Sequence, residues 1–241
     1  MKTKNKKALV TGASRGIGLA IAEALAEDGY DLFITARDSR ALEKVKSALS
    51  QKSVRIDFAS SDLADVAGLE AMFRRATGFL GGIDVLINNA GIGIKSRLVD
   101  LSYDDWEKML AVNLRAPFLL SRLAARLMIS QKSGHIINIG SGASQTPIAE
   151  HAAYCATKHG LLGFSESLAL ELREFGIKVS IVLPGSTATH FSGSTPDKRV
   201  ETHPGILLPQ DIADSVLYLL NQRHEAWTSI LNIRPLNLNR S

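Results

Sequence analysis

The chain has 241 residues, of which 45% are hydrophobic and 22% charged, an ordinary balance for a globular protein. No apolar run approaches the ~18 residues of a membrane-spanning helix, and the single cysteine, Cys155, excludes a disulfide within the chain. The net charge of +4 is modest, and lysines before Ala8 account for much of it, which favours a solvated terminus over a nucleic-acid-binding arm. Only a short apolar run, Ala8 to Val10, follows those lysines, so we expect no secretory signal. These features predict a cytoplasmic protein with neither nucleic acid nor a membrane as its partner.

Short apolar runs alternate with amphipathic segments along the whole chain. The predicted strands cover residues 7–11, 31–36, 54–58, 84–88, 135–139, 179–183 and 230–233. The predicted helices cover residues 16–28, 39–50, 65–79, 103–129 and 154–175, and a last one begins near Pro209. Strands made of continuous apolar residues indicate a parallel sheet that helices cover on both faces. We therefore predict a single doubly wound α/β domain over residues 1–241, with a ligand at the carboxyl ends of its strands.

The first strand leads into a glycine-rich turn, Thr11-Gly12-Ala13-Ser14-Arg15-Gly16-Ile17-Gly18. Glycines at such a turn let the backbone approach a pyrophosphate, which the free N–H groups of the following helix can bind. The glycine spacing differs from the common dinucleotide fingerprint, because the wider gap comes first. A merely tight strand–helix turn is the alternative.

The second strand ends at Ala36, where a carboxylate would bind the ribose 2′-hydroxyl of NAD. Asp38 lies two residues further on, and Arg37 and Arg15 can converge on a 2′-phosphate instead. This pattern favours NADP(H) as the cofactor. An exposed ion pair between Arg37 and Asp38 at a helix start is the alternative.

Polar residues also follow the third, fourth and fifth strands. Asp62, before Leu63, is suited to an adenine amino group or, equally, to capping the next helix. The stretch Asn88-Asn89-Ala90-Gly91 allows close backbone approach to a ligand, or forms an ordinary turn. Ser141 follows the fifth strand, and Asn113 interrupts a long apolar helix, where a polar side chain needs a partner.

After the sixth strand, Pro184-Gly185 opens a polar segment that runs to about Leu208 without a clear helix or strand pattern. Loops of this length are uncommon in compact domains and often close over a site. We predict that residues 185–208 form a substrate lid.

Tyr154 and Lys158 are four residues apart on a predicted helix and therefore share one face. An ammonium roughly 4–5 Å from a phenol supplies ~3–4 kcal/mol of Coulomb energy at an effective dielectric of ~20. This is about the energy needed to bring a phenol pKa from ~10 toward neutrality. The pair therefore predicts an acid–base tyrosine whose pKa the lysine lowers, although many such pairs are simply solvated.

Taken together, these motifs resemble the classical short-chain dehydrogenase/reductase family. The match runs in order through the glycine-rich turn, Asp62, Asn88–Gly91, Asn113, Ser141, Tyr154-x-x-x-Lys158 and Pro184-Gly185 with Thr189. The resemblance implies a Rossmann-type fold with a mainly parallel seven-stranded sheet and a reaction that interconverts alcohols and carbonyl compounds by hydride transfer. The cofactor-binding residues that we expect are Gly12, Ser14, Arg15, Gly16, Ile17, Gly18, Arg37, Asp62, Leu63, Asn89, Ala90, Gly91, Tyr154, Lys158, Pro184, Gly185, Thr187 and Thr189.

The resemblance also assigns catalytic roles. Tyr154 would donate a proton to the carbonyl oxygen, Ser141 would polarise that carbonyl, and Lys158 would hold the nicotinamide ribose and lower the pKa of Tyr154. Asn113 would position a water molecule that links Lys158 to solvent. Thr189 would contact the nicotinamide carboxamide. The same resemblance predicts a homodimer or homotetramer, because the two long helices carry apolar residues on more than one face.

The chain ends differently from the 3-oxoacyl-acyl-carrier-protein reductases of that family. Those usually close on a glycine-rich stretch, whereas here Ile233-Arg234-Pro235 follows the last strand. This ending is more similar to reductases of sepiapterin-like carbonyls, small hydroxy acids or diketones. A 3-oxoacyl compound and these smaller carbonyls are the alternative substrates.

A function of another class is a non-catalytic NADP-binding sensor on the same fold. Such a sensor has no need for Ser141, Tyr154 and Lys158 together, so the intact set favours an enzyme. The six histidines show no HExxH-like pair and Cys155 pairs with none of them, so no metal site is expected. Cys155 itself is predicted to be a small buried neighbour of Tyr154 rather than a reactive thiol.

Overall fold

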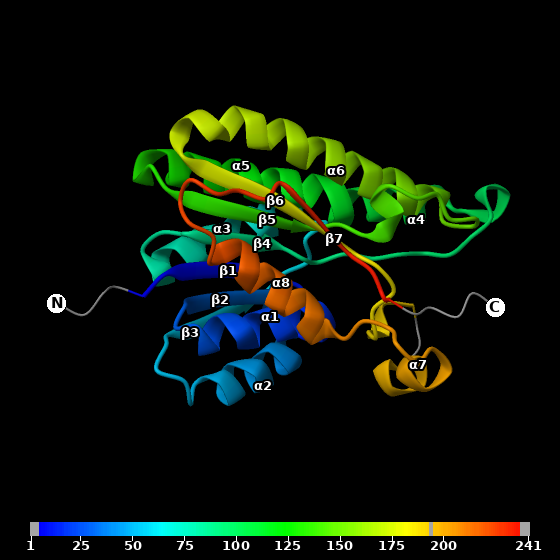
Figure 1. The fold of residues 1–241 in the computed structure, drawn as a ribbon, viewed down its shortest axis with the longest axis horizontal. Coiled ribbons are helices and arrows are strands. Elements are labelled where there is room, and N and C mark those ends of the chain that lie inside the picture. Colours follow the sequence, from blue (N-terminus) through cyan, green and yellow to red (C-terminus); the bar gives the residue numbers. More distant parts are fainter. Residues whose placement is uncertain (1–4, 193–194, 237–241) are drawn as a thin grey trace.

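The computed structural model describes residues 5–192 and 195–236. At its centre is a seven-stranded sheet with the order β3-β2-β1-β4-β5-β6-β7 (Figure 1). Every pairing is parallel, where the sequence predicted a mainly parallel sheet. The strands are β1 Lys7–Thr11, β2 Asp31–Ala36, β3 Ile56–Ser60, β4 Val85–Asn88, β5 Gly134–Ile139, β6 Ile177–Pro184 and β7 Ile230–Ile233. This is the doubly wound, Rossmann-type arrangement expected from the alternation of strands and helices.

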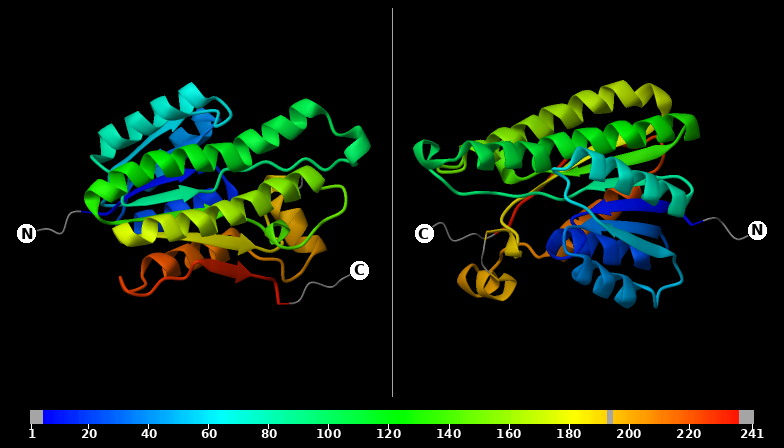
Figure 2. Two further views of the ribbon diagram at one scale, coloured as in Figure 1. Left: turned by 90° about the horizontal axis from the view of Figure 1, so that it is seen from above. Right: turned by 180° about the vertical axis from the view of Figure 1, so that it is seen from behind.

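Helices cover both faces of the sheet (Figures 1 and 2). On one face lie α1 Gly16–Glu27, α2 Ser39–Leu49 and α8 Pro209–Leu220. On the other lie α3 Val66–Leu80, α5 Ala116–Gln131 and α6 Ala152–Leu172, with α4 Tyr103–Leu110 leading into α5. The short helix α7 Pro196–Thr202 lies beyond the sheet, in the segment between β6 and α8 (Figure 1). None of these helices in the described part of the chain is long and apolar enough to cross a membrane.

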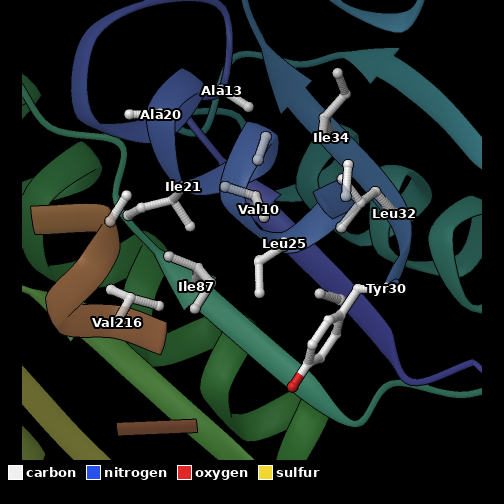
Figure 3. Close-up of a cluster of buried hydrophobic side chains, with 14 of the residues drawn as sticks. Val10, Ala13, Ala20, Ile21, Leu25, Tyr30, Leu32, Ile34, Ile87 and Val216 are labelled. Carbon is white, nitrogen blue, oxygen red and sulfur yellow. The ribbon is translucent and has the colours of Figure 1, made fainter. Parts of the chain in front are cut away.

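Both faces of the central strands are buried, which explains their continuous apolar sequence. In β1, Val10 packs beneath α1 and α8, whereas its neighbour Leu9 packs with α3 and α5. Figure 3 shows the first of these clusters, in which Val10 lies among Ile21, Ile87 and Val216. Because both faces of the sheet are packed, the strands hold the loops at their carboxyl ends in fixed positions.

The third strand was predicted two residues too early. Residues 54–58 were expected, but β3 is Ile56–Ser60, and Leu32 of β2 pairs with Ile56. Val54 belongs to the preceding turn, because its N–H bonds to the carbonyl of Lys52 at 2.8 Å. Arg55 is held by the Asp31 carboxylate, which accepts both its backbone N–H and its guanidinium. The strand therefore begins directly after the residue that Asp31 holds.

The helix expected over residues 103–129 runs from Tyr103 to Gln131 but contains a π-helical turn, Ala111–Arg115. Pro117 lies just after this turn and has no N–H to give to the carbonyl of Asn113, four residues earlier. Such turns inside α-helices are frequent at functional sites. The proline thus gives a local reason for the irregular turn at Asn113.

The segment over residues 185–208 is more ordered than its sequence pattern indicated. It contains a 3-10 turn, His190–Ser192, and the helix α7, which Thr195 caps by accepting a hydrogen bond from the N–H of Lys198. Pro196 at the start of the helix is also typical of this position. The prediction of a stretch without helix was therefore wrong, because α7 is too short for its periodicity to be recognised.

Candidate active site

A pocket of about 1130 Å³ opens at the carboxyl ends of the strands. All residues predicted to bind the cofactor line it, and so does Ser141. Asn113 is the exception among the predicted residues, since it lies behind the pocket wall with its side chain buried. The volume exceeds the ~300–1,000 Å³ of most small-molecule sites, so the pocket has room for a dinucleotide and a second small ligand.

The glycine-rich turn is shaped by the absence of side chains. Gly12 has φ +68°, and a Cβ there would lie 2.8 Å from Nδ2 of Asn89 and 2.9 Å from Cα of Ala90. Gly16 also has a positive φ, +58°. Arg15 at the start of α1 makes no capping hydrogen bond, and no other side chain in the described part of the chain caps this turn. Its N–H groups are therefore free to bind an anion.

At the end of β2, Asp38 is engaged in the protein. Its carboxylate accepts the N–H of Ala41 at 3.0 Å and caps α2. Arg37 is exposed and forms no ion pair within the described residues, so the alternative of an Arg37–Asp38 pair is wrong. Arg37 and Arg15 both line the pocket. This end of the pocket thus offers two cations that form no ion pair with any residue that the structure describes.

Asp62 also lines the pocket and is exposed. Its carboxylate accepts the N–H of Ala64 at 3.0 Å, in a local turn. The cap of α3 is Asp65 instead, which accepts the N–H of Ala67 at 3.1 Å. The alternative that Asp62 caps the next helix is therefore wrong, because the cap lies three residues later, at Asp65.

Thr11 connects the glycine-rich turn to the residues after β4. Its hydroxyl accepts the N–H groups of Asn89 and Ala90, both at 3.0 Å, and donates to the carbonyl of Ile87 at 3.2 Å. The Asn89 amide in turn donates to the carbonyl of Thr11 at 2.8 Å. Thr11 belongs to the sequence motif but was not predicted as a site residue. Its position directly at the end of a buried strand was the sequence feature that could have identified Thr11 as a site residue.

Ser141, Tyr154 and Lys158 line the same part of the pocket. The Oγ of Ser141 accepts the N–H of Ala143 at 3.1 Å, so its own proton stays available for donation. The Nζ of Lys158 donates to the carbonyl of Ile139 at 2.9 Å and lies 5.9 Å from the ring centroid of Tyr154. A hydroxyl donor, a phenol and an ammonium thus converge where a carbonyl oxygen can bind.

Burial, rather than the lysine, governs the ionisation of Tyr154. Burial raises the pKa of Tyr154 to about 12, with a smaller opposing effect from the Ser141 hydroxyl. Burial also lowers the pKa of Lys158 to about 8. The net shift is thus upward, because burial disfavours the phenolate, and the lowering of the Tyr154 pKa by Lys158 stays a prediction.

Asn113 supports the site from behind. Its Oδ1 accepts the N–H of Ile92 and its Nδ2 donates to the carbonyl of Ile92, both at 2.8 Å. Nδ2 also donates to Oγ1 of Thr157 at 3.1 Å. The side chain thereby fixes the segment after β4 against α6. Its role in positioning a water molecule stays a prediction.

The segment after β6 reaches over the tyrosine. The ring of Phe191 lies 5.5 Å from that of Tyr154, centroid to centroid, and a Cβ on Gly93 would lie 2.7 Å from the Phe191 ring. Phe191 falls in the segment predicted to be the substrate lid, but neither Phe191 nor Gly93 was predicted individually as a catalytic or cofactor-binding residue. The spacing of Phe191 two residues after Thr189 was the only sequence signal.

Fold and site together define a dinucleotide-binding α/β protein with a Ser–Tyr–Lys constellation at its ligand pocket. A family model described as short chain dehydrogenase matches residues 6–200, and the chain belongs to this family. An uncharacterised oxidoreductase of Staphylococcus aureus (strain USA300) is 33% identical over 235 residues, covering 96% of this chain and 98% of that protein.

Two solved structures are similar over nearly their whole length. A metagenomic short-chain oxidoreductase in complex with NADP is 38% identical with a TM-score of 0.84, covering 96% of this chain and 97% of that one. An acetoin dehydrogenase from Salmonella typhimurium is 33% identical with a TM-score of 0.87, covering 96% of this chain and 95% of that one.

Proposed function

We propose that the protein is an NADP-dependent oxidoreductase that interconverts a small carbonyl compound and its alcohol. The observation that carries the proposal is the convergence of Ser141, Tyr154 and Lys158 on the pocket that the glycine-rich turn also lines. The NADP complex of the metagenomic relative and the acetoin dehydrogenase relative support it.

The pocket suits NADP on this chain's own features. The turn at Gly12 leaves no room for a Cβ, and the uncapped N-terminus of α1 presents free N–H groups, as a pyrophosphate requires. Arg15 and Arg37 would hold the 2′-phosphate, whereas the Asp38 carboxylate already caps α2. Lys158 would hold the nicotinamide ribose. When bound, the cofactor supplies the hydride.

The protein's part in the chemistry is to position the carbonyl and to supply a proton. Ser141 donates a hydrogen bond that polarises the carbonyl oxygen. Tyr154, which is protonated at neutral pH because burial raises its pKa to about 12, gives its proton to that oxygen as the alcohol forms. Phe191 lies against the Tyr154 ring and would limit the access of water from this side of the site once a substrate is bound.

The experiment is a screen of NADPH oxidation with diketones, hydroxy ketones, 3-oxoacyl thioesters, quinones and pterins. We expect turnover with the small ketones and with NADPH in preference to NADH. Turnover with 3-oxoacyl thioesters alone would support the alternative substrate. Tight NADPH binding without turnover of any compound would support the sensor instead and contradict the proposal.

A further inference from the structure

His151 lies at the start of α6, three residues before Tyr154, and lines the pocket. The two rings meet edge to face, with centroids 6.5 Å apart and an interplanar angle of 72°. His151 is half-buried, and the function proposed above gives it no role. A polar ring beside the tyrosine that protonates the carbonyl is well placed to contact the substrate.

The hydrogen bonding of His151 determines which of its nitrogens can accept a hydrogen bond from a ligand. Nδ1 lies 2.9 Å from the carbonyl oxygen of Ala149. A carbonyl oxygen only accepts, so Nδ1 carries the proton, and in the uncharged ring Nε2 is an acceptor. Within the described residues, Nε2 has no hydrogen-bond partner. The pocket therefore contains a preset acceptor close to Tyr154.

The loop that carries His151 is held in place by its neighbour. Glu150 has φ +61°, a strained conformation for a residue other than glycine. Its carboxylate pairs with Lys95 at 3.0 Å and with Arg97 at 3.7 Å, and its carbonyl accepts the N–H of Ser96 at 2.8 Å. Strain of this kind persists where surrounding contacts enforce it, often next to a binding site. These contacts hold the position of His151 before any ligand arrives.

The side chains around His151 indicate which substrate group its Nε2 would bind. Ile92 packs against the buried cluster that contains Tyr154, and Phe191 covers the tyrosine ring. Thr146 and His190 also line the pocket, but Ser141 and His151 are the polar side chains that the structure places beside Tyr154, by a hydroxyl effect on its pKa and by a ring contact. Ser141 is a donor suited to the carbonyl oxygen, so His151 offers the complementary group, an acceptor for a substrate O–H.

We propose that His151 determines specificity by accepting, at Nε2, a hydrogen bond from a hydroxyl group on the carbon next to the reacting carbonyl. The preferred substrates are then α-hydroxy ketones, and the products are vicinal diols. This inference rests on the carbonyl reduction proposed above and names its substrate class.

The test compares three ketones of similar shape: acetoin, its methyl ether and butanone. The ether keeps the oxygen but lacks the proton that His151 would accept. We expect kcat/KM with NADPH to be roughly tenfold higher for acetoin than for the ether. In His151→Phe, which keeps an aromatic ring beside Tyr154, the acetoin-to-ether ratio should fall to about one. His151→Asn retains a side-chain acceptor and should restore part of the ratio.

His159→Phe is the matched control, because His159 lies on the same helix with Nδ1 bonded to the carbonyl of Cys155 at 2.9 Å but does not line the pocket. It should keep the native ratio. An equal ratio in the native protein and in His151→Phe would overturn the inference while leaving carbonyl reduction intact.

Calorimetry of the three ketones with the NADP-loaded protein separates the two proposals. Tighter binding of acetoin that His151→Phe abolishes, without turnover of any ketone, would support the role of His151 and contradict the proposed reaction. Equal binding of all three ketones, without turnover, would overturn both.

Discussion

The ammonium of Lys158 lies 5.9 Å from the ring centroid of Tyr154, and it donates to the carbonyl of Ile139 at the end of β5. The spacing of four residues on α6 sets this separation. Both side chains are buried, and burial favours the uncharged form of each. It raises the pKa of Tyr154 to about 12 and lowers that of Lys158 to about 8. The tyrosine is therefore a phenol at neutral pH, the form that donates a proton.

Replacing Tyr154 by Phe should abolish most of the reduction. The change removes the hydroxyl but keeps a ring to pack against Phe191. General acid catalysis contributes about 10²–10⁴-fold, so we expect kcat to fall at least a hundredfold while the NADPH dissociation constant changes little. Steady-state rates and a fluorescence titration of NADPH measure the two effects. A variant within tenfold of the native rate would show that another group supplies the proton.

The two directions of the reaction should respond differently to pH. Alcohol oxidation needs the phenolate as proton acceptor, and the pKa of Tyr154 is raised to about 12. The phenolate fraction therefore increases with pH throughout the accessible range, so oxidation should speed up as pH rises. Reduction uses the phenol, which stays protonated below that value. Rates in both directions between about pH 7 and 10 test this. Oxidation that is independent of pH would contradict it.

Arg37→Ala should weaken NADPH binding without weakening NADH binding. The Arg37 guanidinium is exposed, lines the pocket and has no ion-pair partner among residues 5–192 and 195–236. Loss of one charge-assisted hydrogen bond should raise the NADPH dissociation constant roughly ten- to a hundredfold. Arg40→Ala removes the same charge from the exposed start of α2, outside the pocket, and is the control. Equal native affinities for the two cofactors would argue against a 2′-phosphate site.

The sequence predicted most of the fold because its signals are local. The continuous apolar runs of β1, β2 and β7 gave strands with the observed limits, and Gly29, at φ +84°, ends the first helix as expected. What could not be predicted depends on contacts between distant residues. The start of β3 is set by its pairing with β2, where Leu32 pairs with Ile56. The proximity of Phe191 to Tyr154 needs the space at Gly93, and the pKa of Tyr154 reflects burial by the whole fold.

The protein should self-associate through α5 and α6. These helices lie side by side on one face (Figure 2), where Phe118 packs edge to face on Phe164 with ring centroids 6.2 Å apart. Phe118 and Leu170 expose 44% and 69% of their surface, so both helices present large apolar side chains that a subunit contact could bury. Sedimentation at micromolar concentration should show a dimer or tetramer. Leu170→Glu should shift the distribution toward the monomer, and a purely monomeric native protein would contradict the prediction.

Acid should destabilise the protein through His135, which lies buried in β5. Burial, with a smaller contribution from Lys178 on the neighbouring strand, lowers the pKa of His135 from 6.5 to about 3. Below pH 6.5 the unfolded chain gains a proton at this residue that the folded protein does not, so stability decreases as pH falls toward 3. Between pH 7 and 5 this one residue should remove about 2 kcal/mol from the free energy of unfolding.

The ring nitrogen Nε2 of His135 lies 2.9 Å from Oγ of Ser180, which itself donates to the carbonyl of Thr228 at 2.6 Å. Nε2 is thus the donor, and His135→Gln can place an amide N–H near the same point without a titratable group. Urea denaturation at pH 7 and 5 should show a loss about 2 kcal/mol smaller in His135→Gln than in the native protein. His203→Gln, at an exposed position, is the control and should behave like the native protein. The same loss in all three proteins would mean that groups other than His135 govern the acid sensitivity between pH 7 and 5.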